Sequence, residues 1–354
     1  MNQKNDNLSI SIIIPVYNGE KHIGRCLDAV CASSYSPCEI IVVDDNSTDK
    51  TIDIARQKGV IVHQLPERAG PAVARNYGAK HAMGEILLFI DSDVEVRKDT
   101  LAAVNEDFRR YPKITAVFGS YDDTPSEENF LSQYRNLMHH FHHQQAREEA
   151  FSFWAGCGAI KKCVLMGIGG FDQNRYKKHS IEDIELGYRL CAKGHKILLD
   201  NRLLVKHLKQ WKFIQMIRTD ILLRAIPWSY LILESKYMPM DLNLKLHHKI
   251  STILAGIMIF LMPLLLLRGD DLFSFNFVMF IGIILFSFLI LNKTFYVFFF
   301  RKKGIDFTIK VFPFHVLYYC YSGASFVLCC FIYYIRCFRR IVKRGRHTRN
   351  YKFK

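Results

Sequence analysis

The chain has 354 residues, of which 50% are hydrophobic, so it can bury one large core or two ordinary ones. Its formal net charge is +15, and its 10 cysteines form no CxxC pair and no spacing typical of zinc ligands. These features argue against a disulfide framework or a zinc module, and we expect the cysteines to be small buried hydrophobic residues.

The part of the chain up to about residue 210 alternates between β-rich and helical stretches. The expected strands are "SISIIIPVYN", "CEIIVVDDNSTD", Val60 to Leu65 and Glu85 to Ile90. Helices are expected from Glu20 to Cys31, from near Ser47 or Thr48, and from Ala72 to Met83. This alternation predicts an α/β fold, with a mostly parallel, Rossmann-like sheet and helices on both of its faces.

Polar residues follow three of the expected strands at the points where the strands end. They are Tyr17, the pair Asp44 and Asp45, and the pair Asp91 and Asp93. Ligands of open α/β sheets bind outside the carboxyl ends of the strands, so we expect these side chains to share one edge of the sheet.

The spacing of Asp91 and Asp93 suits one divalent cation, or one cation and a ribose hydroxyl. The alternative is an ordinary Asp-rich turn before the next helix. The sequence has no G-x-G-x-x-G after the first strand and no G-x-x-x-x-G-K-[ST], which disfavours a dinucleotide dehydrogenase or a P-loop NTPase.

Six motifs resemble those of inverting family 2 glycosyltransferases with the GT-A fold, in order and in approximate spacing, over residues 9 to 210. They are "SIIIPVYNGE", "IIVVDDNSTD", "AGPAVARNYGA", "FIDSDVEV", "GIGGFDQN" and "IEDIELGYRLCAKGHKI". The resemblance implies a nucleotide-sugar donor, usually UDP-linked, a divalent cation such as Mg²⁺ or Mn²⁺, and direct displacement at the anomeric carbon.

The same resemblance assigns roles to residues at the donor site. Tyr17 would lie against the nucleotide base, Asp45 would hydrogen-bond the base, and Asp91 would face the ribose or the metal. Asp93 would hold the metal on the diphosphate. The remaining residues expected to bind the nucleotide sugar are Pro15, Arg75 and Ser92.

The acceptor side is expected at "HSIEDIELGYRL". Here the family implies that Asp183 is the general base and that Glu182 orients the acceptor. A structural role is the alternative, because Ser180 and Asp183 have the spacing of a helix-capping box. Trp154 and Gly156 are expected to line the acceptor cleft.

Two groups of histidines are candidate metal ligands. His207 follows an expected strand from Lys196 to Val205, where GT-A enzymes commonly have a histidine that reaches the metal; a structural histidine is the alternative. His139 and His143 have the spacing of helical zinc ligands, but no third ligand is evident, so a helix that borders the acceptor cleft or is merely solvated is favoured.

The C-terminal third has the composition of a membrane region. Three apolar runs are long enough to cross a bilayer as helices: Ile250 to Leu267, Leu272 to Leu291 and Val311 to Ile335. Buried helices of a soluble core are the alternative. Before these runs, residues 211–246 are expected to form amphipathic helices at the membrane interface, with Trp211 and Trp228 as anchors; a helix packed on the domain's own core is the alternative.

The basic residues from Arg336 onward indicate attraction to anionic lipid on the cytoplasmic side, and nucleic-acid binding is the weaker interpretation. We see no signal peptide. A cytosolic N-terminus and three crossings would place this tail outside, against the positive-inside tendency. Either one run, with Val311 to Ile335 the first candidate because polar residues interrupt it, is re-entrant or split, or the tail breaks the rule. The number of spans stays open between two and four.

The sequence therefore predicts four parts: a catalytic GT-A domain at 1–210, interfacial helices at 211–246, transmembrane helices at 247–338, and a basic tail at 339–354. We expect an integral protein of the cytoplasmic membrane with a cytosolic catalytic domain. Its function would be transfer of a sugar to a lipid or lipid-linked glycan. An inactive relative that binds nucleotide sugar or scaffolds an assembly or export complex is the alternative, and the oligomeric state cannot be predicted.

Overall fold

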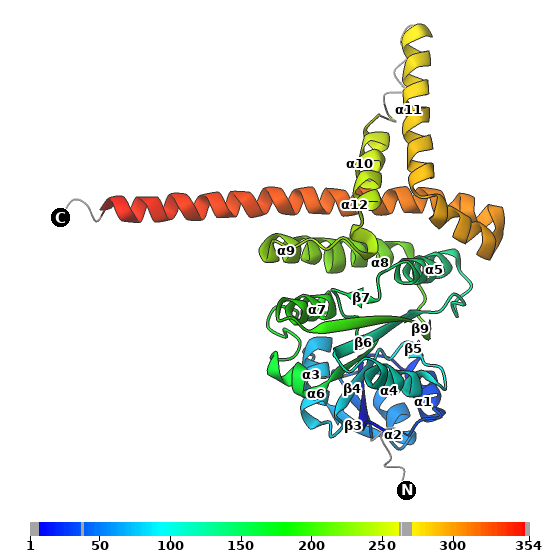
Figure 1. Cartoon of the computed structure of the whole chain (residues 1–354), viewed down its shortest axis with the longest axis vertical. Helices are drawn as coiled ribbons and strands as arrows, with labels where there is room; N and C mark the ends of the chain where they lie inside the picture. Colours follow the sequence, from blue (N-terminus) through cyan, green and yellow to red (C-terminus); the bar gives the residue numbers. More distant parts are fainter. Residues whose placement is uncertain (1–6, 37–38, 262, 264–270, 351–354) are drawn as a thin grey trace. The chain divides into compact units, whose positions relative to one another are not determined.

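The computed structural model describes residues 7–36, 39–261, 263 and 271–350. The chain divides into two compact units, Met1–Phe213 and Ile214–Lys354, which are described separately. Figure 1 shows the α/β unit in blue to green and the helical unit in green to red.

The first unit is built on one sheet of nine strands. Along the sheet the order is β3-β2-β1-β4-β8-β6-β9-β5, and β7 pairs with β9 beside this path. The strands are β1 (Ile10–Val16), β2 (Glu39–Asp44), β3 (Ile61–Gln64), β4 (Ile86–Ile90), β5 (Val94–Glu95), β6 (Ile114–Tyr121), β7 (Glu149–Ala150), β8 (Cys157–Lys161) and β9 (Lys196–His207).

The first four strands of this order are parallel, as the sequence predicts, because a helix follows each strand and carries the chain back. The rest of the sheet is mixed. β8 runs antiparallel to both β4 and β6, whereas β6 and β9 are parallel. The α/β fold class is thus confirmed.

Helices cover both faces of the sheet. They are α1 (Ile23–Cys31), α2 (Thr51–Gln57), α3 (Pro71–His81), α4 (Thr100–Arg110), α5 (Phe130–Gln144), α6 (Lys162–Gly167) and α7 (Glu182–Ala192). Side chains alternate along β1: Ile12 and Ile14 pack with residues of α1 and α4, and Ile13 packs with residues of α3 and α7. Every residue of β1 and β4 is buried, as expected for central strands.

This arrangement brings three strand ends to one edge. Val16, the last residue of β1, is paired with Asp44, the last residue of β2, and the Asp45 amide donates to the Val16 carbonyl over 2.8 Å. β4 lies on the other side of β1 and ends at Ile90, directly before Asp91. The predicted convergence at one edge of the sheet is therefore observed.

The second unit consists of helices: α8 (Phe213–Arg218, which begins one residue before the boundary), a π-helical turn η1 (Thr219–Ala225), α9 (Ile226–Ser235), a short 3-10 turn η2 (Leu242–Leu244), α10 (Leu246–Leu261), α11 (Asp271–Leu291) and α12 (Lys293–Asn350). α12 is kinked at Gly304, whose φ is 79°. A polar group joins α10 to the start and middle of α12: His248 Nδ1 is 2.6 Å from the Tyr319 hydroxyl, which donates to Asn292 Oδ1 over 3.0 Å.

Among the described residues, one helix segment, Lys293–Arg339, is long and apolar enough to cross a membrane. Leu246–Leu261 and Asn276–Leu291 are shorter apolar helices. Part of the predicted run from Ile250 to Leu267 lies outside the described residues.

The prediction that Trp211 anchors the chain at the membrane interface is wrong. Its side chain is buried inside the first unit, its backbone amide donates to Ser132 Oγ over 2.7 Å, and Lys209 and Arg135 lie over its ring. A buried indole cannot reach a membrane interface.

Candidate active site

The first part of the site is a wall of side chains at the ends of β1 and β2. Tyr17 is half-exposed, and the guanidinium of Arg68 lies 3.8 Å from the centre of its ring. Asp45 is buried, and its carboxylate accepts hydrogen bonds from the amides of Ala69 (2.7 Å) and Gly70 (2.9 Å). Tyr17 and Asp45 thus share the edge where the sequence places them, and Arg68 is an addition that sequence reasoning missed.

The loop after residue 176 packs against this wall. Gly70 has a φ of 95°, and a Cβ at this position would lie 2.5 Å from the carbonyl oxygen of Lys177. Only glycine tolerates both the backbone conformation and the close approach. Gly70 therefore fixes the path of a loop that ends at the N-terminus of α7.

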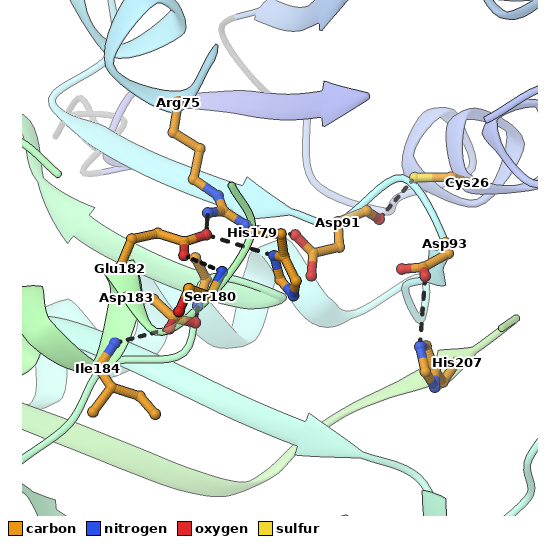
Figure 2. A network of polar contacts seen from close by, with 11 residues as sticks. Cys26, Arg75, Asp91, Asp93, His179, Ser180, Glu182, Asp183, Ile184 and His207 are labelled. Atoms are coloured by element: carbon orange, nitrogen blue, oxygen red, sulfur yellow. Dashed lines mark hydrogen bonds and ion pairs between the residues drawn. The ribbon is translucent and has the colours of Figure 1, made fainter. Parts of the chain in front are cut away.

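Arg75 connects the donor edge to α7. This side chain is only 2% exposed, and it donates to Asp91 Oδ1 and to Glu182 Oε1, each over 2.8 Å (Figure 2). Arg75 comes from α3, Asp91 from the end of β4, and Glu182 from the first turn of α7. The sequence predicts Arg75 as a nucleotide-sugar ligand, and in this structure its guanidinium is engaged by two carboxylates.

Two consecutive residues, Ala155 and Gly156, connect Asp183 to Asp91 through backbone hydrogen bonds. Asp183 Oδ2 accepts from the amide of Ala155 over 3.1 Å, and the carbonyl of the next residue, Gly156, accepts from the amide of Asp91 over 3.2 Å. The base predicted on α7 and the first aspartate after β4 therefore belong to the same site, as Figure 2 shows.

The capping box expected at Ser180 is wrong. α7 begins at Glu182 with Ile181, not Ser180, at its N-cap. The Ser180 amide donates to Glu182 Oε2 over 2.8 Å, and the Asp183 carboxylate accepts from the Ile184 amide over 2.8 Å. The acids of the first turn thus hold the Ser180 and Ala155 amides instead of forming the Ser180–Asp183 pair of a capping box.

The two acids of α7 differ in their electrostatics. Burial, followed by the negative charge of Glu182, raises the pKa of Asp183 to about 6. Burial also favours neutral Glu182, but His179 and the Arg75 guanidinium outweigh it and lower the pKa of Glu182 far below its usual range. Glu182 is consequently a fixed negative charge, and Asp183 is the acid that exchanges a proton near neutral pH.

Asp93 faces His207 from the loop after β4. Asp93 Oδ2 is 3.6 Å from His207 Nε2, and the His207 ring stacks on Tyr121 with centroids 4.2 Å apart. Burial opposes the charge of Asp93, but His207 outweighs it and holds the pKa of this carboxyl well below its usual range. Figure 2 shows Asp93 and His207 beside the group formed by Arg75 and Asp91.

The donor atoms of Asp93 and His207 suit a divalent cation completed by a substrate. At metal–ligand distances of about 2.1 Å, two ligands of one ion lie roughly 3.0 Å apart when adjacent and about 4.2 Å apart when opposite. The observed 3.6 Å falls within this interval. The described residues contain no cluster of three or more His, Cys, Asp or Glu side chains that could hold an ion, which fits a site whose remaining ligands are phosphate oxygens and water.

An aromatic group extends from His207 toward α5. Tyr121 contacts His207, Trp154 and His139, and His139 lies 4.0 Å from the ring of His143. His143 is buried, its Nδ1 is 3.2 Å from the Gly119 carbonyl, and burial lowers its pKa to about 4. His139 and His143 therefore pack against Trp154 at the border of the site, which agrees with the preferred interpretation over metal binding.

The remaining predicted residues lie along the same edge. Trp154 and Gly156 precede β8, and a Cβ on Gly156 would overlap the Trp154 ring at 2.3 Å. Ser92 lies beside Gly19, next to the loop that carries Tyr17. Pro15 is inside β1, opposite Val43.

Residues 11–167 match the sequence model of glycosyl transferase family 2. The chain carries a family 2 glycosyltransferase domain. The matched span includes the end of β1, the Arg75 helix, the aspartates after β4 and the bridge at Ala155, and it stops before α7.

Known glycosyltransferases are similar to part of this chain. Glycosyltransferase GlyA of Streptococcus pneumoniae is 33% identical over 125 residues, which is 34% of this chain and 18% of GlyA. The poly(ribitol-phosphate) β-N-acetylglucosaminyltransferase TarS of Staphylococcus aureus is 40% identical over 101 residues, which is 27% of this chain and 18% of TarS. The chain spans well under half of the length of the curated relatives that it matches.

A solved structure supports the fold. The mannosyltransferase PcManGT from Pyrobaculum calidifontis, in complex with GDP-Man and Mn2+, aligns with a TM-score of 0.50 and 16% sequence identity over 91% of this chain and 87% of that chain. At this identity the likeness concerns the fold alone.

Proposed function

We propose that this protein is a metal-dependent inverting glycosyltransferase that moves a sugar from a nucleotide-sugar donor, UDP-linked by preference, to a membrane-associated lipid or lipid-linked glycan. The observation that carries the proposal is that Arg75 and the Ala155–Gly156 bridge connect Asp91 to the start of α7 at Asp183, while Asp93, two residues after Asp91, faces His207. This arrangement supplies acids on both sides of a position where an anomeric carbon could react.

At the donor side, Tyr17 and Arg68 offer a stacked aromatic and cationic surface for a base, and Asp45 lies behind them. Pro15 and Ser92 belong to the strand and the loop that flank this surface. The function proposed for these residues is to orient the nucleotide.

Asp93 and His207 would hold a divalent cation, Mg²⁺ or Mn²⁺, with Asp91 turned toward it or toward the ribose. The cation would offset the negative charge that develops on the departing nucleoside diphosphate. Asp93 suits this task because its carboxyl is ionised throughout the physiological range.

At the acceptor side, Asp183 would take the proton of the attacking hydroxyl. A base works best when its pKa lies near the operating pH, and the pKa of about 6 meets this condition better than an ordinary aspartate does. Glu182 and Arg75 would keep Asp183 in place, and Trp154 with Gly156 would border the acceptor.

A lipid acceptor is proposed because the second unit consists of apolar helices followed by a basic segment. Such a unit fits an integral protein of the cytoplasmic membrane, with the first unit in the cytosol.

The proposal is tested by measuring the turnover of nucleotide sugar. Protein purified in detergent is incubated with a panel of nucleotide sugars, Mn²⁺ or Mg²⁺, and a lipid extract, and the release of nucleoside diphosphate is recorded. The proposal expects release that requires both the metal and the lipid extract. Binding of nucleotide sugar without turnover under any of these conditions would instead support an inactive binding or scaffold protein.

A further inference from the structure

The helices of the second unit divide into two groups by their exposed side chains. On α11, Val278, Met279, Phe280 and Ile283 are exposed among the described side chains and point in different directions by their spacing, whereas Phe288 near the C-terminal end is buried. On α10, Phe260 near the C-terminal end is likewise exposed. These described stretches of α10 and α11 thus have the surface of helices surrounded by lipid.

α12 has a different surface over its apolar segment. Its exposed apolar side chains from Ala324 onward form a stripe on one side of the helix by their spacing: Ala324, Val327, Leu328, Phe331, Tyr334 and Phe338. Val311, His315, Tyr319 and Cys329 are buried on the opposite side, which gives the helix one apolar face for lipid and one face for protein.

The covered side of α12 packs on the helices that precede α10. The Tyr321 hydroxyl donates to Asp220 Oδ2 over 2.5 Å, and Cys329 Sγ lies 3.8 Å from the Ile226 carbonyl oxygen. Asp220 is buried and is also 3.6 Å from Arg224 on the same turn. α12 therefore runs along a segment that carries an ion pair, which fits the headgroup layer better than the hydrocarbon core.

α10 crosses α12 instead of running beside it. His248 meets Tyr319, and Thr252 approaches Gly323, where a Cβ would lie 2.5 Å from the Thr252 methyl group. Ala255, further along α10, shares a buried cluster with Val316, on the other side of Tyr319. Figure 1 shows α10 and α11 standing across α12.

The charges also distinguish α10 and α11 from α12. Lysines and arginines flank the end of the α10–α11 pair that meets α12, at Lys245, Lys249, Lys293 and Arg301 to Lys303, and more follow from Arg336. The sequence between α10 and the start of α11 contains one basic residue, Arg268, and two acidic residues, Asp270 and Asp271. If α12 crossed the bilayer, one of its two basic ends would lie outside, against the positive-inside rule.

We infer that only the α10–α11 pair crosses the bilayer, and that the apolar segment of α12 lies along the cytoplasmic headgroup layer with its exposed stripe against anionic lipid. This inference deepens the proposed membrane association. It resolves the conflict in the sequence, because two crossings return the chain to the cytosol and leave the basic segment from Arg336 beside the negatively charged leaflet. Length alone selects α12 as a span, but its crossing geometry and its flanking charges oppose that role.

A depth measurement in vesicles tests the inference. A dansyl amino acid is introduced by stop-codon suppression at Ala324, Phe331 or Phe338 of the full chain, and quenching by lipids brominated at different acyl positions is recorded. These positions span 14 residues, or about 21 Å of helix. A helix lying in the headgroup layer gives one shallow depth at all three sites. A crossing helix gives a depth that changes by more than 10 Å between Ala324 and Phe338.

Phe280 and Ile290 of α11 serve as the matched control, because these exposed sites are about 15 Å apart along a helix that we expect to cross, and Phe280 lies near the middle of that helix. They must differ in depth in the same assay.

A reporter fused after Lys354 provides a second reading in cells. Green fluorescent protein fluoresces, and alkaline phosphatase is inactive, when the fusion point is cytoplasmic. An active phosphatase, or a graded depth along α12, overturns the inference. Neither reading depends on catalytic turnover, so failure of the enzyme assay would leave this test intact.

Discussion

Arg75 offers the sharpest test of the site's architecture. Substitution of Arg75 by Met keeps the length of the side chain but removes both of its ion pairs. Glu182, which is 1% exposed, would then carry a buried charge without its guanidinium partner. Breaking a buried pair in this way costs about 3–5 kcal/mol. For a domain of this size, each kcal/mol corresponds to roughly 2–4 °C, so we expect the melting temperature to fall by about 6–20 °C.

Two control variants make this experiment decisive. Arg25→Met removes an ion pair with Glu95 of similar length, 2.7 Å, but with an arginine side chain that is 54% exposed. Exposed pairs contribute roughly 0–1 kcal/mol, so this variant should melt within about 4 °C of the wild type. Arg75→Met combined with Glu182→Gln removes the stranded charge and should recover part of the loss.

Melting is followed by intrinsic fluorescence of the full chain in detergent. Equal melting temperatures for Arg75→Met and Arg25→Met would refute the reasoning, and so would a double variant less stable than Arg75→Met alone.

Three further predictions concern individual groups. Transfer activity should rise with pH to half of its maximum near pH 6, because Asp183 acts as a base only when ionised and its pKa is raised to about 6; a profile that is flat from pH 5 to 8 would contradict this. Arg68→Ala should weaken nucleotide binding roughly 2- to 30-fold in calorimetry, since a cation over an aromatic ring contributes about 0.5–2 kcal/mol; unchanged affinity would remove Arg68 from the site. Gly70→Ala should lower the melting temperature because its φ is 95° and its Cβ would meet the Lys177 carbonyl, whereas Gly59→Ala, with φ of 69° but open space, is the milder control.

Much of the first unit could be predicted from local patterns. The apolar strands that come directly before Asp45 and Asp91 have a hydrophobic periodicity and a polar stop that depend only on neighbouring residues, and the helices between them imply parallel pairing. The antiparallel insertion of β8 between β4 and β6 has no such local signal, because register between distant strands depends on tertiary packing.

The parts of the site that the sequence did not predict are long-range contacts. Arg68 stacks on Tyr17, and Arg75 joins Asp91 to Glu182; these partners are far apart in the sequence, and no spacing rule connects them. The error at Trp211 has a similar origin, because an apolar stretch with flanking basic residues looks the same whether it faces a bilayer or the protein's own core.

The error at Ser180 shows a limit of motif reasoning. Ser-x-x-Asp has the residue types of a capping box, but both acids of this turn bind other amides: Glu182 accepts from Ser180 itself, and Asp183 accepts from Ala155. A carboxylate used in a tertiary contact is not free to cap, and the sequence does not show which contact prevails.

The central claim is that Asp93 belongs to the metal and the donor, whereas Asp183 belongs to the acceptor. The most direct measurement compares Asp93→Asn and Asp183→Asn with the wild type, by titration of Mn²⁺ with nucleoside diphosphate in electron paramagnetic resonance and by transfer to lipid extract. The account predicts that Asp93→Asn loses the metal-dependent binding of nucleoside diphosphate and that Asp183→Asn keeps this binding within a few-fold but loses transfer. Full metal-dependent binding in Asp93→Asn, or loss of both properties in a folded Asp183→Asn protein, would contradict it.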